Sequence, residues 1–291
     1  MLTAMVTPFT PDGEVDYVAV RRLATYLVDE QRNDGLIVNG TTGESPTTSD
    51  EEKQRIVSAV LEAVGDRATV VAGAGTNDTR HSVELAKQAA RAGAHGLLVV
   101  TPYYNKPPQE GLYRHFTAVA DATDLPVMLY DIPGRSGVPI KTETLIRLAQ
   151  HERIVAVKDA KGDLFAGSQV MVATDLAFYS GDDLLNLAWL SLGAAGFVSV
   201  VGHVVGADLA RMIRLHKNGD VAQALEVHSQ VAPVVDGIML RAGGAIMAKA
   251  ALSMVGVPVG PVRLPLVDAT EKQIAELRAC LVAGGVKLTD E

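Results

Sequence analysis

The sequence predicts an α/β fold, a (β/α)8 TIM barrel with a helical extension at its carboxyl end. Over residues 1–219 of the 291, eight short apolar runs alternate with amphipathic stretches of helical period. Two of these runs, 97–100 and 154–157, are continuously apolar, as strands buried on both faces are. Parallel strands need crossover helices, and eight strand–helix units close into a barrel. After residue 219 the alternation stops, so we expect a catalytic barrel over residues 1–219 and a helical extension over 220–291.

The predicted elements follow one another in a regular order. Strands are expected at 2–9, 35–40, 69–75, 96–104, 125–133, 154–160, 178–183 and 196–201. Helices are expected at 16–31, 50–64, 79–92 and 109–122, several of them opening on Asp, Ser or Thr, and in the extension at 221–240, 244–255 and 270–283. An open doubly wound sheet is the alternative, but its nucleotide-binding forms carry a glycine fingerprint, of which Gly73 and Gly75 supply only the start.

Composition excludes several classes of function. The hydrophobic content of 48% is enough for a large core, whereas the net charge of −8 argues against nucleic acid or an anionic membrane as partner. Cys280 is the single cysteine, so no intrachain disulfide and no thiolate metal cluster can form. The sequence has neither a signal segment nor an apolar run of about 18 residues. We therefore expect a soluble cytoplasmic protein.

A lysine follows the sixth predicted strand at its carboxyl end, where barrels of this kind place their active sites. Lys158 comes directly after the apolar run 154–157. Burial penalises an ammonium, and a neutral lysine amine is a nucleophile that forms Schiff bases with carbonyl compounds. The alternative is a lysine that reaches solvent or pairs with Asp159. Lys249 is a second lysine among apolar residues, but we expect its ammonium to reach solvent from a helix of the extension.

Other strand ends add polar groups to the same side of the predicted barrel. Thr41 and Thr42 lie in a glycine-bounded turn whose hydroxyl and N–H groups suit a small carboxylate. Tyr130 ends the fifth predicted strand, where its phenol could transfer a proton or pack at the rim. Arg135 follows a Pro-Gly turn, and its planar guanidinium matches a carboxylate, although a surface arginine remains the alternative.

Five segments in the same order make the sequence similar to a known family. They are TAMVTPF at 3–9, GTTGESPT at 40–47, TPYYNKP at 101–107, LYDIPGRSG at 129–137 and VKDA at 157–160. Together they resemble the dihydrodipicolinate synthase family of lysine-dependent (class I) pyruvate aldolases, which also includes N-acetylneuraminate lyase. The resemblance covers nearly the whole chain, so it is far more specific than any single motif.

The resemblance implies a lyase that needs no metal and no organic cofactor. Lys158 would form a Schiff base with pyruvate, and the resulting enamine would attack the aldehyde of L-aspartate 4-semialdehyde to give 4-hydroxy-tetrahydrodipicolinate, in diaminopimelate and lysine biosynthesis. Thr42, Tyr130 and Tyr104 would relay protons, with Tyr104 reaching into the site of a neighbouring subunit. The family is typically a homotetramer.

The resemblance also assigns the groups that hold the substrates. Thr41 and Thr42 would bind the pyruvate carboxylate, Arg135 the carboxylate of the semialdehyde, and Gly181 and Val198 would line the site through their backbone. A related aldolase that cleaves a sugar acid or N-acetylneuraminate would not need Arg135, which makes it the weaker alternative. A barrel that only binds a keto acid would have no reason to retain the lysine together with its proton relay.

Two departures from the family concern regulation and a loop. Where lysine-inhibited members carry histidines and a glutamate, this sequence has Asp50, Lys53 and His81, so we expect weak or no inhibition by lysine. The segment 31–34 lacks the glycine with which relatives end their first helix. That loop lies at the amino end of the second strand, opposite the expected active site.

Overall fold

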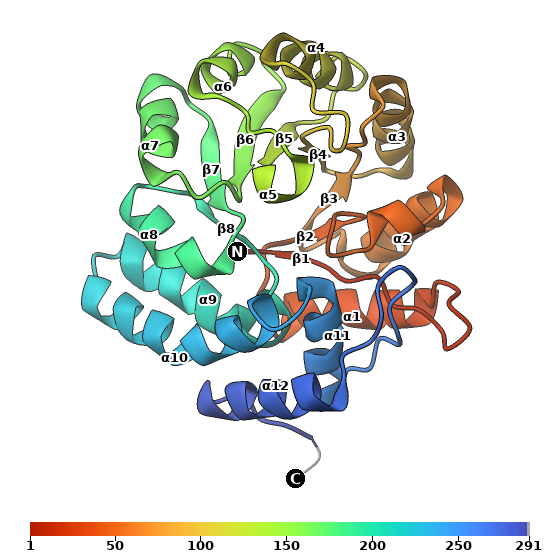
Figure 1. The fold of residues 1–291 in the computed structure, drawn as a ribbon, viewed down its shortest axis with the longest axis vertical. Coiled ribbons are helices and arrows are strands. Elements are labelled where there is room, and N and C mark those ends of the chain that lie inside the picture. The colour runs from red at the N-terminus through yellow and green to blue at the C-terminus, as the bar shows by residue number, and fades with distance from the viewer. Residues whose placement is uncertain (290–291) are drawn as a thin grey trace. The chain divides into compact units, whose positions relative to one another are not determined.

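Eight parallel strands form a closed barrel in chain order in the computed structural model, which describes residues 1–289 (Figure 1). The predicted (β/α)8 barrel is thereby confirmed. The strands are β1 Leu2–Ala4, β2 Gly35–Val38, β3 Thr69–Gly73, β4 Gly96–Val100, β5 Val127–Asp131, β6 Ile154–Asp159, β7 Ala177–Ser180 and β8 Gly196–Ser199. All eight end before the predicted boundary, because the residues after each apolar run leave the sheet as loops.

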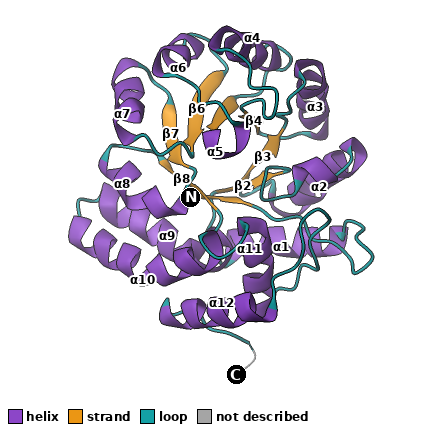
Figure 2. Ribbon diagram, in the orientation of Figure 1, coloured by secondary structure: helices purple, strands orange, loops and turns teal. Residues whose placement is uncertain are grey.

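Helices follow the strands and then continue alone into the extension (Figure 2). They are α1 Tyr17–Asp29, α2 Asp50–Val64, α3 Thr79–Ala92, α4 Gln109–Ala120, α5 Pro133–Ser136, α6 Thr142–Leu148, α7 Leu164–Ala173, α8 Asn186–Ser191, α9 Gly202–Lys217, α10 Val221–Met239, α11 Gly244–Met254 and α12 Glu271–Ala283, with 3-10 turns η1 Ser45–Thr47 and η2 Asp183–Leu185. The predicted bounds of α2 and α3 are confirmed to the residue. The last two residues of the predicted extension, 290 and 291, lie outside the described range.

Side chains at the amino ends of the helices explain where they begin. Ser49 accepts a hydrogen bond from the Glu52 N–H, and the Glu52 carboxylate accepts one from the Ser49 N–H, so α2 starts with a capping box. Asp16 caps α1 by accepting from the N–H groups of Val18 and Ala19. The first helix therefore begins one residue after the predicted start at residue 16.

The chain divides into two compact units, and the first comprises Met1–Thr69 with the segment from Ser199 onward. In it β1 pairs with β2, and α10 packs against α9, α11 and α12. His203 is fully buried at the start of α9, where its Nε2 accepts from the Val6 N–H at 3.1 Å and its Nδ1 lies 2.7 Å from the Val200 carbonyl oxygen. These bonds place the proton on Nδ1.

The second unit comprises Val70–Val198. Its strands β4 to β7 pair in parallel, and α3, α4, α6 and α7 lie outside them (Figure 1). Trp189 is fully buried and stacks on Phe178 with 5.7 Å between ring centroids. Gly167 is needed beside it, because a Cβ there would lie 2.3 Å from the indole ring.

No single helix within residues 1–289 has the length and hydropathy of a membrane span. The helices α10 and α11 reach these values only together, across a bend of 116°.

Candidate active site

Lys158 lies on β6 of the second unit with only 4% of its surface exposed. Its Nζ is 4.1 Å from the centroid of the Tyr130 ring, and the two residues face each other in the β5–β6 register. Within the described part of the chain, Lys158 forms no ion pair. The expectation of a buried lysine is confirmed, and the alternative of an ammonium that reaches solvent or pairs with Asp159 is wrong.

The Asp159 carboxylate is engaged elsewhere. Its Oδ1 accepts hydrogen bonds from the N–H groups of Lys161 and Gly162, at 3.0 and 2.9 Å. Since alternate residues of a strand point to opposite faces, Asp159 points away from the face that carries Lys158. Burial raises the pKa of this carboxyl.

Asp131 follows Tyr130 on β5 and stands opposite Asp159 in the register. It is fully buried, accepts from the Ile140 N–H at 3.1 Å and lies 3.3 Å from the Lys161 ammonium. Burial raises its pKa to about 6, although the Lys161 charge acts in the opposite direction. Asp131 therefore supports the loop from β5 to Ile140, which carries Arg135.

Gly181 lies against Lys158. A Cβ at Gly181 would be 2.8 Å from the Lys158 Cγ and 3.0 Å from its Cε, so no side chain fits there without displacing the lysine. The Gly181 N–H donates to the Asp159 carbonyl at 2.7 Å, which fixes the loop after β7 beside β6. Val198 is buried on β8 in the same unit.

Two further predicted site residues of this unit lie on exposed turns. Tyr104 follows β4 with 89% of its surface exposed and a φ of 73°, a left-handed conformation that is unusual for tyrosine. Arg135 lies on the one-turn helix α5, is exposed, and forms no ion pair with any residue in the range 1–289. Both side chains are thus free of partners within the described chain and available to a ligand or to another subunit.

Thr41 and Thr42 belong to the first unit, in the turn after β2. Thr41 is exposed, whereas Thr42 is buried. The turn is closed by a hydrogen bond from the Glu44 N–H to the Thr41 carbonyl at 3.1 Å, and Thr7 Oγ1 donates to the Gly43 carbonyl at 2.6 Å. A Cβ on Gly43 would lie 3.1 Å from the Met5 carbonyl oxygen, so this position favours glycine.

Sequence reasoning missed a buried set of charges next to this turn. The expectation that Lys249 reaches solvent is wrong, since it is 5% exposed and its Nζ lies 2.8 Å from Glu44 Oε1. Burial lowers the pKa of this lysine, while Glu44 acts in the opposite direction. Arg263 donates its backbone N–H to Glu44 Oε2 at 2.8 Å. The sequence did contain a signal for this ion pair. Lys249 stands among Met247, Ala248 and Ala250, and a charge on an apolar helix face needs a buried partner.

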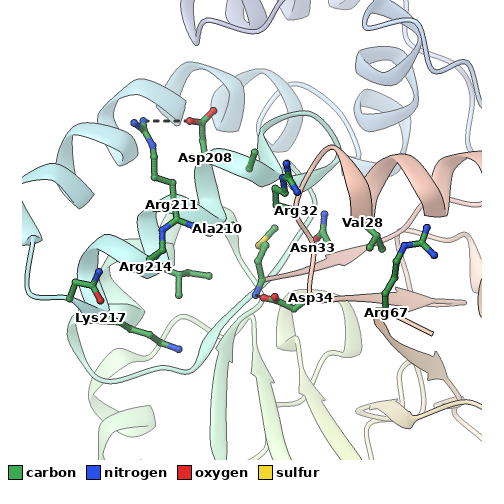
Figure 3. A pocket seen from close by; sticks show the side chains of 14 residues that line it. Val28, Arg32, Asn33, Asp34, Arg67, Asp208, Ala210, Arg211, Arg214 and Lys217 are labelled. Atoms are coloured by element: carbon green, nitrogen blue, oxygen red, sulfur yellow. Dashed lines mark hydrogen bonds and ion pairs between the residues drawn. The ribbon is translucent and has the colours of Figure 1, made fainter. Parts of the chain in front are cut away.

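A separate cleft of about 1070 Å³ opens in the first unit (Figure 3). It is lined by Arg32 and Arg67 and by three cationic residues of α9, Arg211, Arg214 and Lys217. Its loops precede β2 and β3, so it lies at the amino ends of the strands, whereas barrel active sites lie at the carboxyl ends. None of the predicted site residues lines it, and we do not assign catalysis to this cleft.

Comparison with known proteins gives consistent matches over the whole chain. The sequence pattern of the Dihydrodipicolinate synthetase family matches residues 1–283. The "4-hydroxy-tetrahydrodipicolinate synthase 2" of Streptomyces coelicolor is 63% identical over 288 residues, which cover 99% of this chain and 96% of that protein. The "4-hydroxy-tetrahydrodipicolinate synthase" of Acidothermus cellulolyticus is 63% identical over 98% of this chain and 92% of its own. The crystal structure of DHDPS from Cyanidioschyzon merolae with lysine bound matches with a TM-score of 0.95 at 44% identity, covering 98% of both chains.

Proposed function

Because the chain belongs to the dihydrodipicolinate synthetase family, we propose that Lys158 is the lysine with which it performs its reaction. The chain is a lyase that condenses pyruvate with L-aspartate 4-semialdehyde to 4-hydroxy-tetrahydrodipicolinate, in diaminopimelate and lysine biosynthesis. One observation carries the assignment: Lys158 is buried at the carboxyl end of β6, its amine beside the Tyr130 ring and without an ion-pair partner in the described chain.

Schiff-base formation requires the unprotonated amine. The neutral Lys158 amine attacks C2 of pyruvate, and the resulting carbinolamine loses water to give a protonated Schiff base. Loss of a proton from C3 gives an enamine, whose C3 attacks the aldehyde carbon of the semialdehyde. The amino group of the semialdehyde then attacks the imine carbon, closes the ring and releases Lys158 as the free amine. One water is released overall, and no oxidation or reduction occurs.

Tyr130 is proposed to carry protons in these steps together with Thr42 and Tyr104. The Tyr130 ring lies beside the Lys158 amine, with 4.1 Å between Nζ and the ring centroid, and this supports a place for its phenol in the same site. Tyr104 is proposed to act in a partner subunit. Its exposure of 89% and its left-handed backbone support this, because a strained and uncovered tyrosine is explained if another copy of the chain receives it.

The substrate carboxylates are assigned to two places. Thr41 and Thr42 hold the pyruvate carboxylate through the N–H and hydroxyl groups of their turn, while Gly181 and Val198 line the site through their backbone. Arg135 holds the carboxylate of the semialdehyde, and its exposed, unpaired guanidinium is suited to a bidentate contact.

We further propose a homotetramer in the cytoplasm, with residues 1–219 as the catalytic barrel and 220–291 as the extension. The exposed apolar side chains Phe165 and Val172 on α7, at 75% and 90%, support an additional contact between subunits. Sedimentation measured across a range of protein concentrations gives the oligomeric state. A chain that stays monomeric while fully active would contradict the proposed role of Tyr104.

The proposed lysine is tested by borohydride reduction in the presence of pyruvate, followed by mass spectrometry of the digested protein. We expect a pyruvate adduct on Lys158 that is lost in Lys158→Arg and kept in Lys161→Arg, which changes a nearby lysine in the loop after β6 whose ammonium lies 3.3 Å from Asp131. A coupled assay compares aspartate 4-semialdehyde with N-acetylneuraminate as substrates. An unmodified Lys158 in the active wild-type enzyme would rule out the assignment.

A further inference from the structure

We propose that Lys249 and Arg263 of the carboxyl-terminal extension are positioning residues for the pyruvate-binding turn, acting through Glu44. The inference rests on the proposed function, because it assigns the turn of Thr41 and Thr42 to the pyruvate carboxylate. It concerns residues 249 and 263, which lie far along the chain from that turn.

Glu44 is the residue through which the turn can be held. It is 3% exposed and has a φ of 56°, in the left-handed region that L-residues with side chains rarely occupy. Such a conformation persists only where the surrounding structure enforces it. Because the Glu44 N–H donates to the Thr41 carbonyl, the backbone of Glu44 sets the geometry of the turn that carries both threonines.

The extension holds both carboxylate oxygens of Glu44. Lys249 Nζ lies 2.8 Å from Oε1 and also donates to the Pro261 carbonyl at 2.6 Å. The Arg263 N–H donates to Oε2 at 2.8 Å. A carboxylate bound at both oxygens by two separate segments has no freedom to rotate, so its backbone is held as well.

Arg263 fixes the segment that follows the turn. Its guanidinium forms two bonds to the Glu52 carboxylate, at 2.6 and 2.9 Å, and donates to the Thr47 carbonyl at 2.6 Å. The guanidinium and the Lys249 ammonium also lie over the Phe9 ring, at 4.3 and 4.2 Å from its centroid. The turn, the 3-10 helix η1 and the start of α2 are therefore held at successive points by one segment of the extension.

This arrangement is better explained by positioning than by stability. Moving two charged groups out of water costs desolvation free energy, which offsets much of the attraction between them. Apolar residues of similar volume often stabilise a core equally well. A buried ion pair does, however, impose a single geometry on the groups it joins. The Glu44–Lys249 pair lies beside the turn assigned to pyruvate, where geometry decides affinity.

The test compares Lys249→Met with Lys272→Met, which removes one positive charge from an exposed position on α12 of the same extension. For Lys249→Met we expect the KM for pyruvate to rise at least about tenfold, while the KM for the semialdehyde stays within about threefold. Lys272→Met should leave both values unchanged. Equal rises in both KM values, or none, would overturn the proposal.

A second variant keeps the test decisive if Lys249→Met does not fold. Glu44→Gln combined with Lys249→Met removes both buried charges and leaves an amide oxygen that can accept from the Arg263 N–H. We expect this variant to fold and to show the same selective rise in the KM for pyruvate. A double variant with wild-type KM values, or one that fails to fold, contradicts a positioning role.

The borohydride experiment separates this inference from the proposed function. If the wild type forms the Lys158 adduct and the double variant forms it at the same rate at low pyruvate, only the positioning role fails. If the wild type forms no adduct on Lys158, the proposed function fails, and the inference fails with it.

Discussion

Replacement of Gly181 by alanine is expected to displace the Lys158 side chain without removing any reacting group. The added Cβ would lie 2.8 Å from the Lys158 Cγ and 3.0 Å from the Asp159 carbonyl oxygen, whereas carbon atoms in contact are separated by about 3.5–4.0 Å. The carbonyl belongs to a strand paired on both sides, so the lysine side chain must move instead, by roughly 0.5–1 Å.

The displacement of the Lys158 side chain gives an expected loss in kcat/KM. A misplacement of about 1 Å typically costs about 10²-fold in catalysis, so we expect kcat/KM for pyruvate to fall about 30- to 100-fold. This corresponds to about 2–3 kcal/mol of lost transition-state stabilisation. Overpacking of the site should also lower the free energy of unfolding by about 1–3 kcal/mol.

The coupled assay and the rate of borohydride trapping measure the effect directly. Gly243→Ala is the control, because its Cβ would have its nearest neighbour at 3.6 Å, an ordinary contact. Denaturant unfolding separates loss of activity from loss of folded protein. A Gly181→Ala enzyme that traps pyruvate at the wild-type rate and keeps its KM would refute the reasoning.

Three further outcomes are expected. Arg135→Ala should raise the KM for the semialdehyde at least about 30-fold and leave borohydride trapping of pyruvate near the wild-type rate; weakened trapping would contradict its assignment. Burial lowers the pKa of His203 to about 4, from about 6.5 in the unfolded chain. Between these two pH values the unfolded chain binds a proton that the folded chain does not. The free energy of unfolding therefore falls as the pH drops from 6.5 to 4. The total loss is about 3 kcal/mol, of which about 2 kcal/mol falls between pH 7 and 5. His203→Asn should remove that part of the pH dependence from the urea-unfolding profile; an unchanged slope would exclude His203 as its source. The resemblance implies that Asp50, Lys53 and His81 stand where lysine-inhibited relatives carry other residues, and the buried Lys53 ammonium already donates to a backbone carbonyl, so we expect millimolar lysine to inhibit weakly or not at all. Strong inhibition in the coupled assay would contradict this.

Local sequence predicted most of the fold, because local patterns determine most of its elements. The capped, amphipathic segments of α2 and α3 begin and end where the sequence indicates. Strand ends were less predictable. The run expected to end at Tyr104 ends at Val100, because a proline at 102 and the left-handed backbone of Tyr104 turn the chain away from the sheet.

The site was predictable where it follows strand order and unpredictable where distant segments meet. The place of Lys158 at the end of an apolar run is a local property, and its burial is confirmed. The partners of Lys249 are not local, since Glu44 and Pro261 reach it from other parts of the chain. The helical period alone predicted a solvent-exposed ammonium, because periodicity within a helix does not show that a distant loop folds back over it.

The bond between Arg263 and Glu44 also has a consequence for protein synthesis. These residues are separated by 219 positions, so at about 5–20 residues per second a ribosome needs roughly 10–40 s to make the second after the first. Val198, the last residue assigned to substrate binding, precedes Arg263 by 65 positions, so for roughly the final 3–13 s of that interval the nascent chain contains every residue assigned to binding and catalysis. It still lacks Arg263 during this time, so we expect the pyruvate-binding turn to reach its final geometry only after residue 263 has been made.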